Sequence, residues 1–131
     1  MIPACTQTLR QLGPYRKMVV ATGGGAVLRT TNWGHMQQGV VIWLCGPPSL
    51  LARRVVKDGV ERRPLLAGEG VTDENRFDKT VEKLEGILEE RRRFYESADL
   101  VVSLEGHGED EALGAPTAVV MYRLMLALND R

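Results

Sequence analysis

Three apolar runs set the expected framework of this chain, at residues 18–22, 40–44 and 100–104. Each run is continuous, without the alternation of a strand that has one face in water. A short continuous run rich in valine, isoleucine and leucine is typical of a strand covered on both faces. The pattern therefore predicts three buried strands of a parallel sheet.

Helical patterns separate and follow these runs. The segment before Gly13 and Pro14 reads as the end of a helix with a Gly-Pro stop. Thr31 and Asn32 are candidate caps for a short helix over 33–38. Longer helices are expected over 47–57, 78–98 and 116–128. Alternating strands and helices predict an α/β fold in which helices flank a parallel sheet.

Residues 58–77 are charged, contain glycine and show little periodicity. A connection of this length in a compact domain is usually a functional lid or a disordered segment. The remaining length suits one domain, and we take residues 1–131 as a single domain with a lid loop at about 58–77.

Charge is distributed unevenly although the net charge is zero. Residues 1–57 contain no aspartate or glutamate, and all 17 acidic residues follow them. The two halves either neutralise each other in one fold, or the first half supplies most of an anion site.

Two cysteines, Cys5 and Cys45, give no disulfide framework and no zinc-ligand spacing. They favour a reducing intracellular compartment. His35 and His107 have no ligand-spaced partners, and we interpret both as surface residues. No apolar run approaches the length of a membrane helix, and we expect neither a membrane nor a nucleic-acid partner.

Glycines at 23, 24 and 25 follow the first apolar run directly. In parallel α/β sheets ligands bind at the carboxyl ends of strands, and bare amides there can donate to an anion or a hydroxyl. Gly23, Gly24 and Gly25 are therefore candidate ligand-binding residues. The alternative is a plain turn.

Arginines form the second set of candidates. Arg63 lies inside the long loop, where it could reach over a phosphate, or remain solvated. The run 91–93 on the longest helix is either a salt-bridged face or places one arginine toward a cleft. Arg53 and Arg54 end the basic half in a similar way.

The order of these pieces carries a family resemblance. TGGGAV, NWGHMQQGVVIWL, LARRVV, RRPLL and LEERRRFYESADLVVSLE follow one another along the chain. From about Leu9 to Leu128 the sequence resembles shikimate kinase, the plant and algal forms most closely. The resemblance implies a P-loop-kinase-type fold with a closing lid, and ATP- and Mg²⁺-dependent phosphorylation of a shikimate hydroxyl.

Residue roles follow from the same resemblance. The three glycines would hold shikimate through backbone amides, and Arg91 would pair with its carboxylate, which a guanidinium fork suits. Arg63 would be the catalytic lid arginine that reaches the nucleotide phosphates. Arg54 would lie against the adenine.

The chain also departs from the family pattern. It contains no G-x-x-x-x-G-K-[ST] loop, so the lysine for the phosphates and the hydroxyl for Mg²⁺ are absent. No acidic residue precedes Asp58, so the aspartate that acts on the shikimate hydroxyl is absent too. Cys45 stands where the family usually has an acid, and a second carboxylate-binding arginine should lie upstream of Met1.

We therefore expect the carboxyl-terminal part of a shikimate kinase, incomplete at its amino end and inactive as this chain alone. A non-catalytic shikimate-kinase-like binding protein is the alternative. A third reading pairs the chain with an amino-terminal fragment or with a second copy of itself. If the plant resemblance holds, the plastid stroma is the expected location.

The resemblance also implies a cost in stability. The absent strand would lie between the apolar runs at 18–22 and 40–44. Each buried amide or carbonyl left unpaired costs about 1–3 kcal/mol, against about 5–15 kcal/mol for a whole domain. We expect a marginal or remodelled fold, and a cooperative monomeric urea transition worth several kcal/mol would contradict this.

Overall fold

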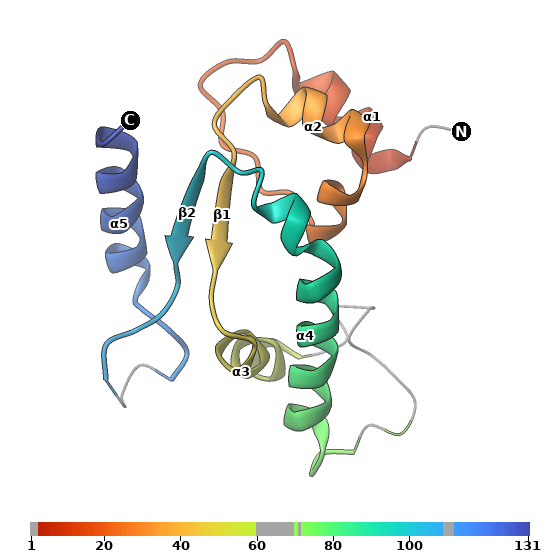
Figure 1. Cartoon of the computed structure of the whole chain (residues 1–131), viewed down its shortest axis with the longest axis vertical. Coiled ribbons are helices and arrows are strands. Elements are labelled where there is room, and N and C mark those ends of the chain that lie inside the picture. The colour runs from red at the N-terminus through yellow and green to blue at the C-terminus, as the bar shows by residue number, and fades with distance from the viewer. Residues whose placement is uncertain (1–2, 60–69, 71, 109–111) are drawn as a thin grey trace. The chain divides into compact units, whose positions relative to one another are not determined.

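The computed structural model describes residues 3–59, 70, 72–108 and 112–131. Its elements, in order, are α1 (Ala4–Leu12), the 3-10 helix η1 (Gly24–Leu28), α2 (Thr30–Met36), β1 (Ile42–Cys45), α3 (Pro48–Asp58), α4 (Arg76–Tyr95), β2 (Leu100–Ser103) and α5 (Thr117–Asn129). Strands β1 and β2 pair in one sheet and run in the same direction (Figure 1). The α/β class with a parallel sheet and flanking helices is thus confirmed.

The predicted strand at 18–22 is wrong. These residues form no regular element, and the side chain of Val19 is 99% exposed. A strand exists only where a neighbouring strand pairs with its amides and carbonyls. No strand among the described residues pairs with this segment, so its apolar composition alone does not make it a strand.

Other predicted elements are confirmed with small shifts. Helix α1 ends before Gly13, the apolar run at 40–44 overlaps β1, which ends one residue later, and the run at 100–104 contains β2. The loop expected at 58–77 is shorter at both ends, because α3 extends to Asp58 and α4 begins at Arg76. Residues 60–69 and 71, with Arg63 among them, lie outside the described residues.

The chain divides into two compact units. The first contains residues Met1–Trp43 and Arg91–Leu100, and the second contains Leu44–Glu90 and Val101–Arg131. The first unit therefore combines the amino-terminal segment with the end of α4.

The core of the first unit holds η1 in place. Helix α1 packs on α2, and α2 packs on η1. The indole Nε1 of Trp33 donates a hydrogen bond to the Val27 carbonyl at 2.9 Å. The Asn32 amide Nδ2 donates to the Ala26 carbonyl at the same distance. Asn32 is thus not the predicted cap: α2 begins at Thr30, and the Asn32 side chain is buried against η1.

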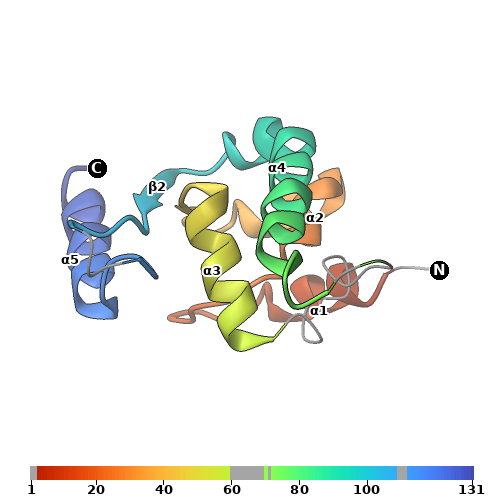
Figure 2. The same cartoon turned by 90° about the horizontal axis from the view of Figure 1, so that it is seen from below.

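The second unit has its own apolar core around β2. Its buried side chains are those of Leu50, Ala52, Val55, Val102, Leu104 and Ala115. Helices α3 and α5 lie on opposite sides of β2 (Figure 2). Arg123 of α5 donates to the Ser103 and Glu105 carbonyls at 2.8 and 2.7 Å, which anchors α5 to the end of β2.

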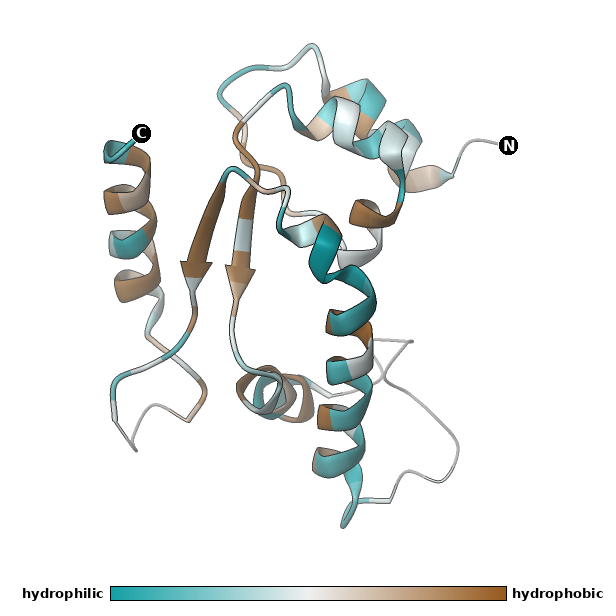
Figure 3. Ribbon diagram, viewed as in Figure 1, coloured by the Kyte–Doolittle hydropathy of each residue, from teal (hydrophilic) through white to brown (hydrophobic). Residues whose placement is uncertain are grey.

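Hydropathy differs sharply among the helices. Helix α5 is apolar around most of its circumference, whereas α4 is mainly polar (Figure 3). None of the helices in the described parts of the chain has the combined length and apolar character required to cross a membrane.

Candidate functional site

The glycine run is free of unusual backbone conformation. None of the three glycines has a positive φ, and Gly23 has an ordinary extended backbone with φ −67° and ψ 153°. Any residue could adopt these angles. The reason for glycine at this place must therefore be space.

Space is restricted only at the middle glycine. A Cβ built on Gly24 would lie 2.8 Å from Nη1 of Arg91 and 3.1 Å from the hydroxyl oxygen of Tyr95. A Cβ on Gly23 or Gly25 would meet no atom within 4 Å. Gly24 thus lets two polar side chains approach the backbone more closely than any other residue would.

Both side chains come from one face of α4. Arg91 and Tyr95 stand at positions i and i+4, which are neighbours on a helix surface. Arg92 and Arg93 are exposed, whereas Arg91 is half-buried. Arg93 instead lies over the ring of Phe94, with its guanidinium carbon 4.7 Å from the ring centroid.

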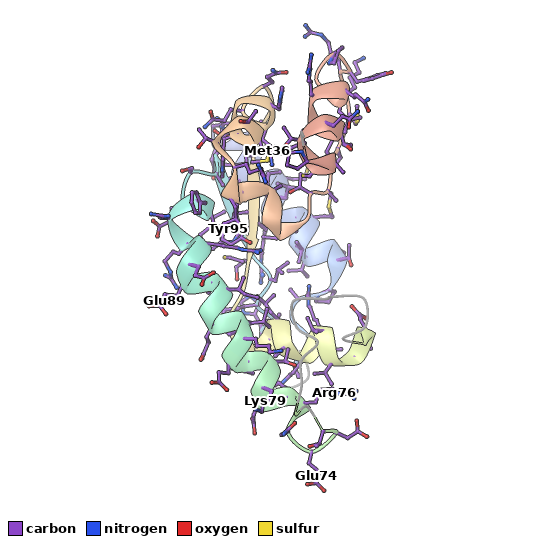
Figure 4. All side chains as sticks on the ribbon, turned by 90° about the vertical axis from the view of Figure 1, so that its right-hand side faces the viewer. Met36, Glu74, Arg76, Lys79, Glu89 and Tyr95 are labelled. Atoms are coloured by element: carbon purple, nitrogen blue, oxygen red, sulfur yellow. The ribbon has the colours of Figure 1, made fainter. Side chains whose placement is uncertain are left out.

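Tyr95 is supported by an aromatic neighbour. Its ring stacks on that of Trp43 with centroids 5.4 Å apart and planes inclined by 12°. Figure 4 shows Tyr95 near the end of α4. Stacked aromatic pairs at such separations are favourable beyond the area that they bury, so Trp43 limits the positions that the phenol can take.

Hydrogen bonds at the start of β1 hold Trp43 opposite α4. The Val41 amide donates to the Asp99 carboxylate at 2.7 Å, and the Asp99 amide donates back to the Val41 carbonyl at 2.8 Å. This exchange joins the residues just before Trp43 to the segment just after Tyr95. These bonds tie together the backbone segments that carry the two aromatic residues.

The Arg91 charge has no partner of opposite sign among the described residues. One ion pair joins Arg76 to Asp73, and Arg76 lies at the opposite end of α4 from Tyr95 (Figure 4). A guanidinium in this state can bind an external anion, and a carboxylate matches its fork of donors. Gly24, Arg91 and Tyr95 together form a small surface with two side-chain donors, which we call the Gly24 site and treat as a candidate for anion binding.

Arg54 lies in the second unit and is already engaged. Its Nε donates to the Leu113 carbonyl at 2.5 Å. A Cβ on Gly114 would lie 2.7 Å from Nη2 of Arg54 and would also strike the Leu104 carbonyl. Gly114 has φ +92°, so glycine here satisfies both a left-handed backbone and a close approach.

The second unit also contains a hollow of about 350 Å³. Pro47, Leu50, Arg53 and Glu105 are among its lining residues. Close by, burial and then the negative charge of Glu105 raise the pKa of the Cys45 thiol above its ordinary value. Cys45 is therefore a protonated thiol at neutral pH, and not a substitute for a carboxylate.

Two features of the chain bear on the binding of nucleotide phosphates and Mg²⁺. Within the described ranges, no three His, Cys, Asp or Glu side chains are grouped to hold a metal ion. The full sequence lacks a phosphate-binding lysine loop. The described residues, which exclude 60–69, 71 and 109–111, therefore identify no ligands for the nucleotide phosphates or Mg²⁺.

Sequence reasoning singled out Gly24 and Arg91 but missed Tyr95 and Trp43. The available signal was the i, i+4 spacing of Arg91 and Tyr95 on a predicted helix. Nothing in the sequence pointed to Trp43, because its contact with Tyr95 joins a strand to a helix end far along the chain.

Known proteins give independent information about the chain. The family model described as shikimate kinase matches residues 4–120. Shikimate kinase 3, chloroplastic, of Oryza sativa subsp. japonica is 39% identical over 126 residues, covering 92% of this chain and 42% of that protein. The shikimate kinase of Synechococcus elongatus is 41% identical over 106 residues, covering 81% and 50%.

A tomato relative, the chloroplastic shikimate kinase of Solanum lycopersicum, is 40% identical over 100 residues, covering 76% of this chain and 32% of that protein. The chain thus spans between a third and a half of the length of these curated relatives. No solved structure matches it. The family model covers most of the chain, and the chain belongs to the shikimate kinase family.

Proposed function

We propose that this chain carries the shikimate-binding part of a shikimate kinase. Arg91 pairs with the substrate carboxylate, and Gly24 leaves room for the Arg91 guanidinium to lie close to the backbone. The observation that carries the proposal is the approach of the Arg91 guanidinium to within 2.8 Å of the Cβ position of Gly24.

Gly23 and Gly25 have a different part in this proposal. They stand at the start of η1, where the first amides of a helix have no partner inside it. The space beside their Cα atoms is open. Their amides can therefore donate to the substrate, as the family resemblance implies.

The phosphoryl-transfer half of the reaction is a separate proposal. Shikimate kinases use ATP and Mg²⁺, and in this family Arg63 would reach the phosphates while Arg54 would lie against the adenine. The chain has no phosphate loop, and positioning and electrostatics supply nearly all the catalysis of phosphoryl transfer. We therefore propose that the chain alone does not turn over.

A non-catalytic shikimate-binding protein is the second candidate. It is favoured by the same absence of a phosphate loop, together with an anion site that needs no nucleotide. The chloroplastic names of the rice and tomato relatives support a plastid location for either protein.

Calorimetric titration with shikimate tests the binding proposal. Wild type should bind, and R91M should bind about 10- to 100-fold more weakly, because a hydrogen-bonded charge contributes about 1.5–3 kcal/mol. R92M removes the same charge from an exposed position on the same helix and should bind like wild type. Equal affinity of R91M and R92M would refute the role of Arg91.

A coupled assay of ADP release tests the proposal of inactivity. The chain with shikimate, ATP and Mg²⁺ should give no turnover above background. Turnover at rates typical of kinases, about 1–100 per second, would show that the chain is a complete enzyme. Restoration of turnover by an added amino-terminal fragment would separate a split enzyme from a binding protein.

A further inference from the structure

We infer that Tyr95 is a further substrate-binding residue, whose hydroxyl donates a hydrogen bond to the carboxylate held by Arg91, and that Trp43 positions it. This inference rests on the proposed carboxylate site. It adds a second donor to that site and names the side chain that holds this donor in place.

Two side-chain donors of α4 converge beside Gly24. Nη1 of Arg91 and the Tyr95 hydroxyl lie 2.8 and 3.1 Å from one point, the Cβ position of Gly24. No ligand atom can sit at that point, because it is one bond length from the backbone. The point shows that both donors lie on the same side of Gly24. An anion that binds Arg91 on that side therefore also comes within reach of the phenol.

The Tyr95 hydroxyl is available to a ligand. Among the described residues it has no hydrogen-bond partner, and the ring stacks on Trp43. A guanidinium only donates hydrogen bonds, and a phenol hydroxyl also has one hydrogen to donate. A carboxylate has about four acceptor sites, so one carboxylate can accept from both donors at once.

The phenol is also held in place. Arg91 and Tyr95 share one face of α4, so the helix keeps their Cα atoms neighbours. The Trp43 ring lies nearly parallel to that of Tyr95, with an interplanar angle of 12°. With the ring held, the phenol reaches the carboxylate by rotation of its O–H bond alone, so little conformational freedom is lost on binding.

The test compares Y95F with wild type in calorimetric titrations with shikimate, cyclohexanecarboxylate and shikimate methyl ester. Y95F removes only the hydroxyl and should weaken both carboxylates about tenfold, because a hydrogen bond to a charged group is lost. The ester carries no charge, so its weak binding should change less than twofold. Y15F is the matched control, since Tyr15 is 68% exposed, and it should bind like wild type.

Each outcome decides a separate question. If Y95F binds both carboxylates as wild type does, the inference is wrong although the proposed function stands. If wild type binds cyclohexanecarboxylate but not shikimate, and Y95F weakens that binding, the tyrosine is right and the proposed substrate is wrong. If wild type binds neither carboxylate, both proposals fail.

A measurement on the unmutated protein covers the case in which Y95F does not fold. With ¹³C-labelled tyrosine, the chain gives three Cζ resonances, from Tyr15, Tyr95 and Tyr122. Spectra of Y15F and Y122F assign the remaining one to Tyr95. Addition of cyclohexanecarboxylate should shift the Tyr95 resonance and leave the other two in place. An unmoved Tyr95 resonance under saturating ligand would overturn the inference.

Discussion

Two arginine–glycine pairs, one in each unit, have nearly the same local geometry and different consequences. In the first unit, Arg91 approaches the Cβ position of Gly24 at 2.8 Å. In the second, Arg54 approaches that of Gly114 at 2.7 Å. The family resemblance assigns a ligand role to both arginines.

The surroundings of the two pairs separate these roles. Gly114 has a positive φ, and Arg54 donates to the adjacent Leu113 carbonyl, so the second pair holds its own loop together. Gly24 has an ordinary φ, and Arg91 has no ion-pair partner among the described residues. Arg91 is therefore the stronger candidate of the two for ligand binding, because the Nε of Arg54 already donates to the Leu113 carbonyl.

The largest expected effect is on stability, from G114A. The substitution forces a left-handed backbone on alanine and drives its Cβ into the Leu104 carbonyl. Backbone strain alone costs about 1–3 kcal/mol, and a clash with main chain cannot be relieved by a side-chain rotation. We expect the free energy of unfolding to fall by about 3 kcal/mol or more in urea titrations.

G108A provides the matched control for that prediction. Gly108 also has a positive φ, +103°, but a Cβ there would meet no atom within 4 Å. It should cost only the strain, about 1–2 kcal/mol. If G114A and G108A destabilise equally, the contact with the Leu104 carbonyl contributes nothing and the comparison with Gly24 weakens.

G24A, unlike G114A, should keep the stability of the fold and lose affinity for the ligand. Its Cβ would meet the ends of two side chains, and Arg91 can swing away, so the fold should tolerate it. Replacing a glycine that has an ordinary φ tends to stabilise, by about 0.4–1 kcal/mol. Shikimate affinity, measured by calorimetry, should fall about 10- to 100-fold because the arginine and the phenol are displaced.

G25A is the control for G24A, because no atom lies within 4 Å of its Cβ position. It should retain affinity within about threefold, or about 0.7 kcal/mol. A loss in G25A as large as that in G24A would mean that the amides or the flexibility of the glycine run matter more than the space beside Arg91.

R54M should reduce the free energy of unfolding by less than G114A does. It keeps the length of the side chain and removes the hydrogen bond to the Leu113 carbonyl. The site is partly exposed, so we expect a loss of about 1 kcal/mol in the free energy of unfolding. R53M, at an exposed position whose guanidinium lies 5.7 Å from the Phe77 ring centroid, should cost less. A larger loss for R53M would reverse the assignment of the structural arginine.

The smallest expected effect is chemical, at the two cysteines. Cys5 is exposed in the first unit, and Cys45 is partly buried in the second. Because burial and Glu105 raise the Cys45 pKa, less thiolate is present at a given pH and alkylation should be slower than at Cys5. The rate at Cys45 should rise as the pH is raised.

E105Q removes the carboxylate charge and should lower the Cys45 pKa slightly, since burial is the larger cause. Iodoacetamide labelling at pH 8, followed by mass spectrometry, measures both rates. Equal rates at the two cysteines of wild type would contradict the difference in pKa.

The sequence by itself determined most of the local structure. Apolar periodicity and stop signals gave α1, α3, α4 and α5 within a few residues, because a helix is stabilised by contacts between neighbours in sequence. Continuous apolar runs gave β1 and β2. The glycine run and Arg91 were also visible, since a residue type can signal its chemistry without knowledge of its neighbours.

Tertiary structure decided the rest. The apolar segment at 18–22 failed as a strand because sheet pairing needs a partner from elsewhere in the chain. The orientation of α4 about its axis turns Arg91, and not Arg92 or Arg93, toward Gly24. The same orientation places Tyr95 beside Gly24 and Trp43. These contacts join residues more than 50 positions apart, and only the folded backbone brings such residues together, which is why local patterns could not foresee them.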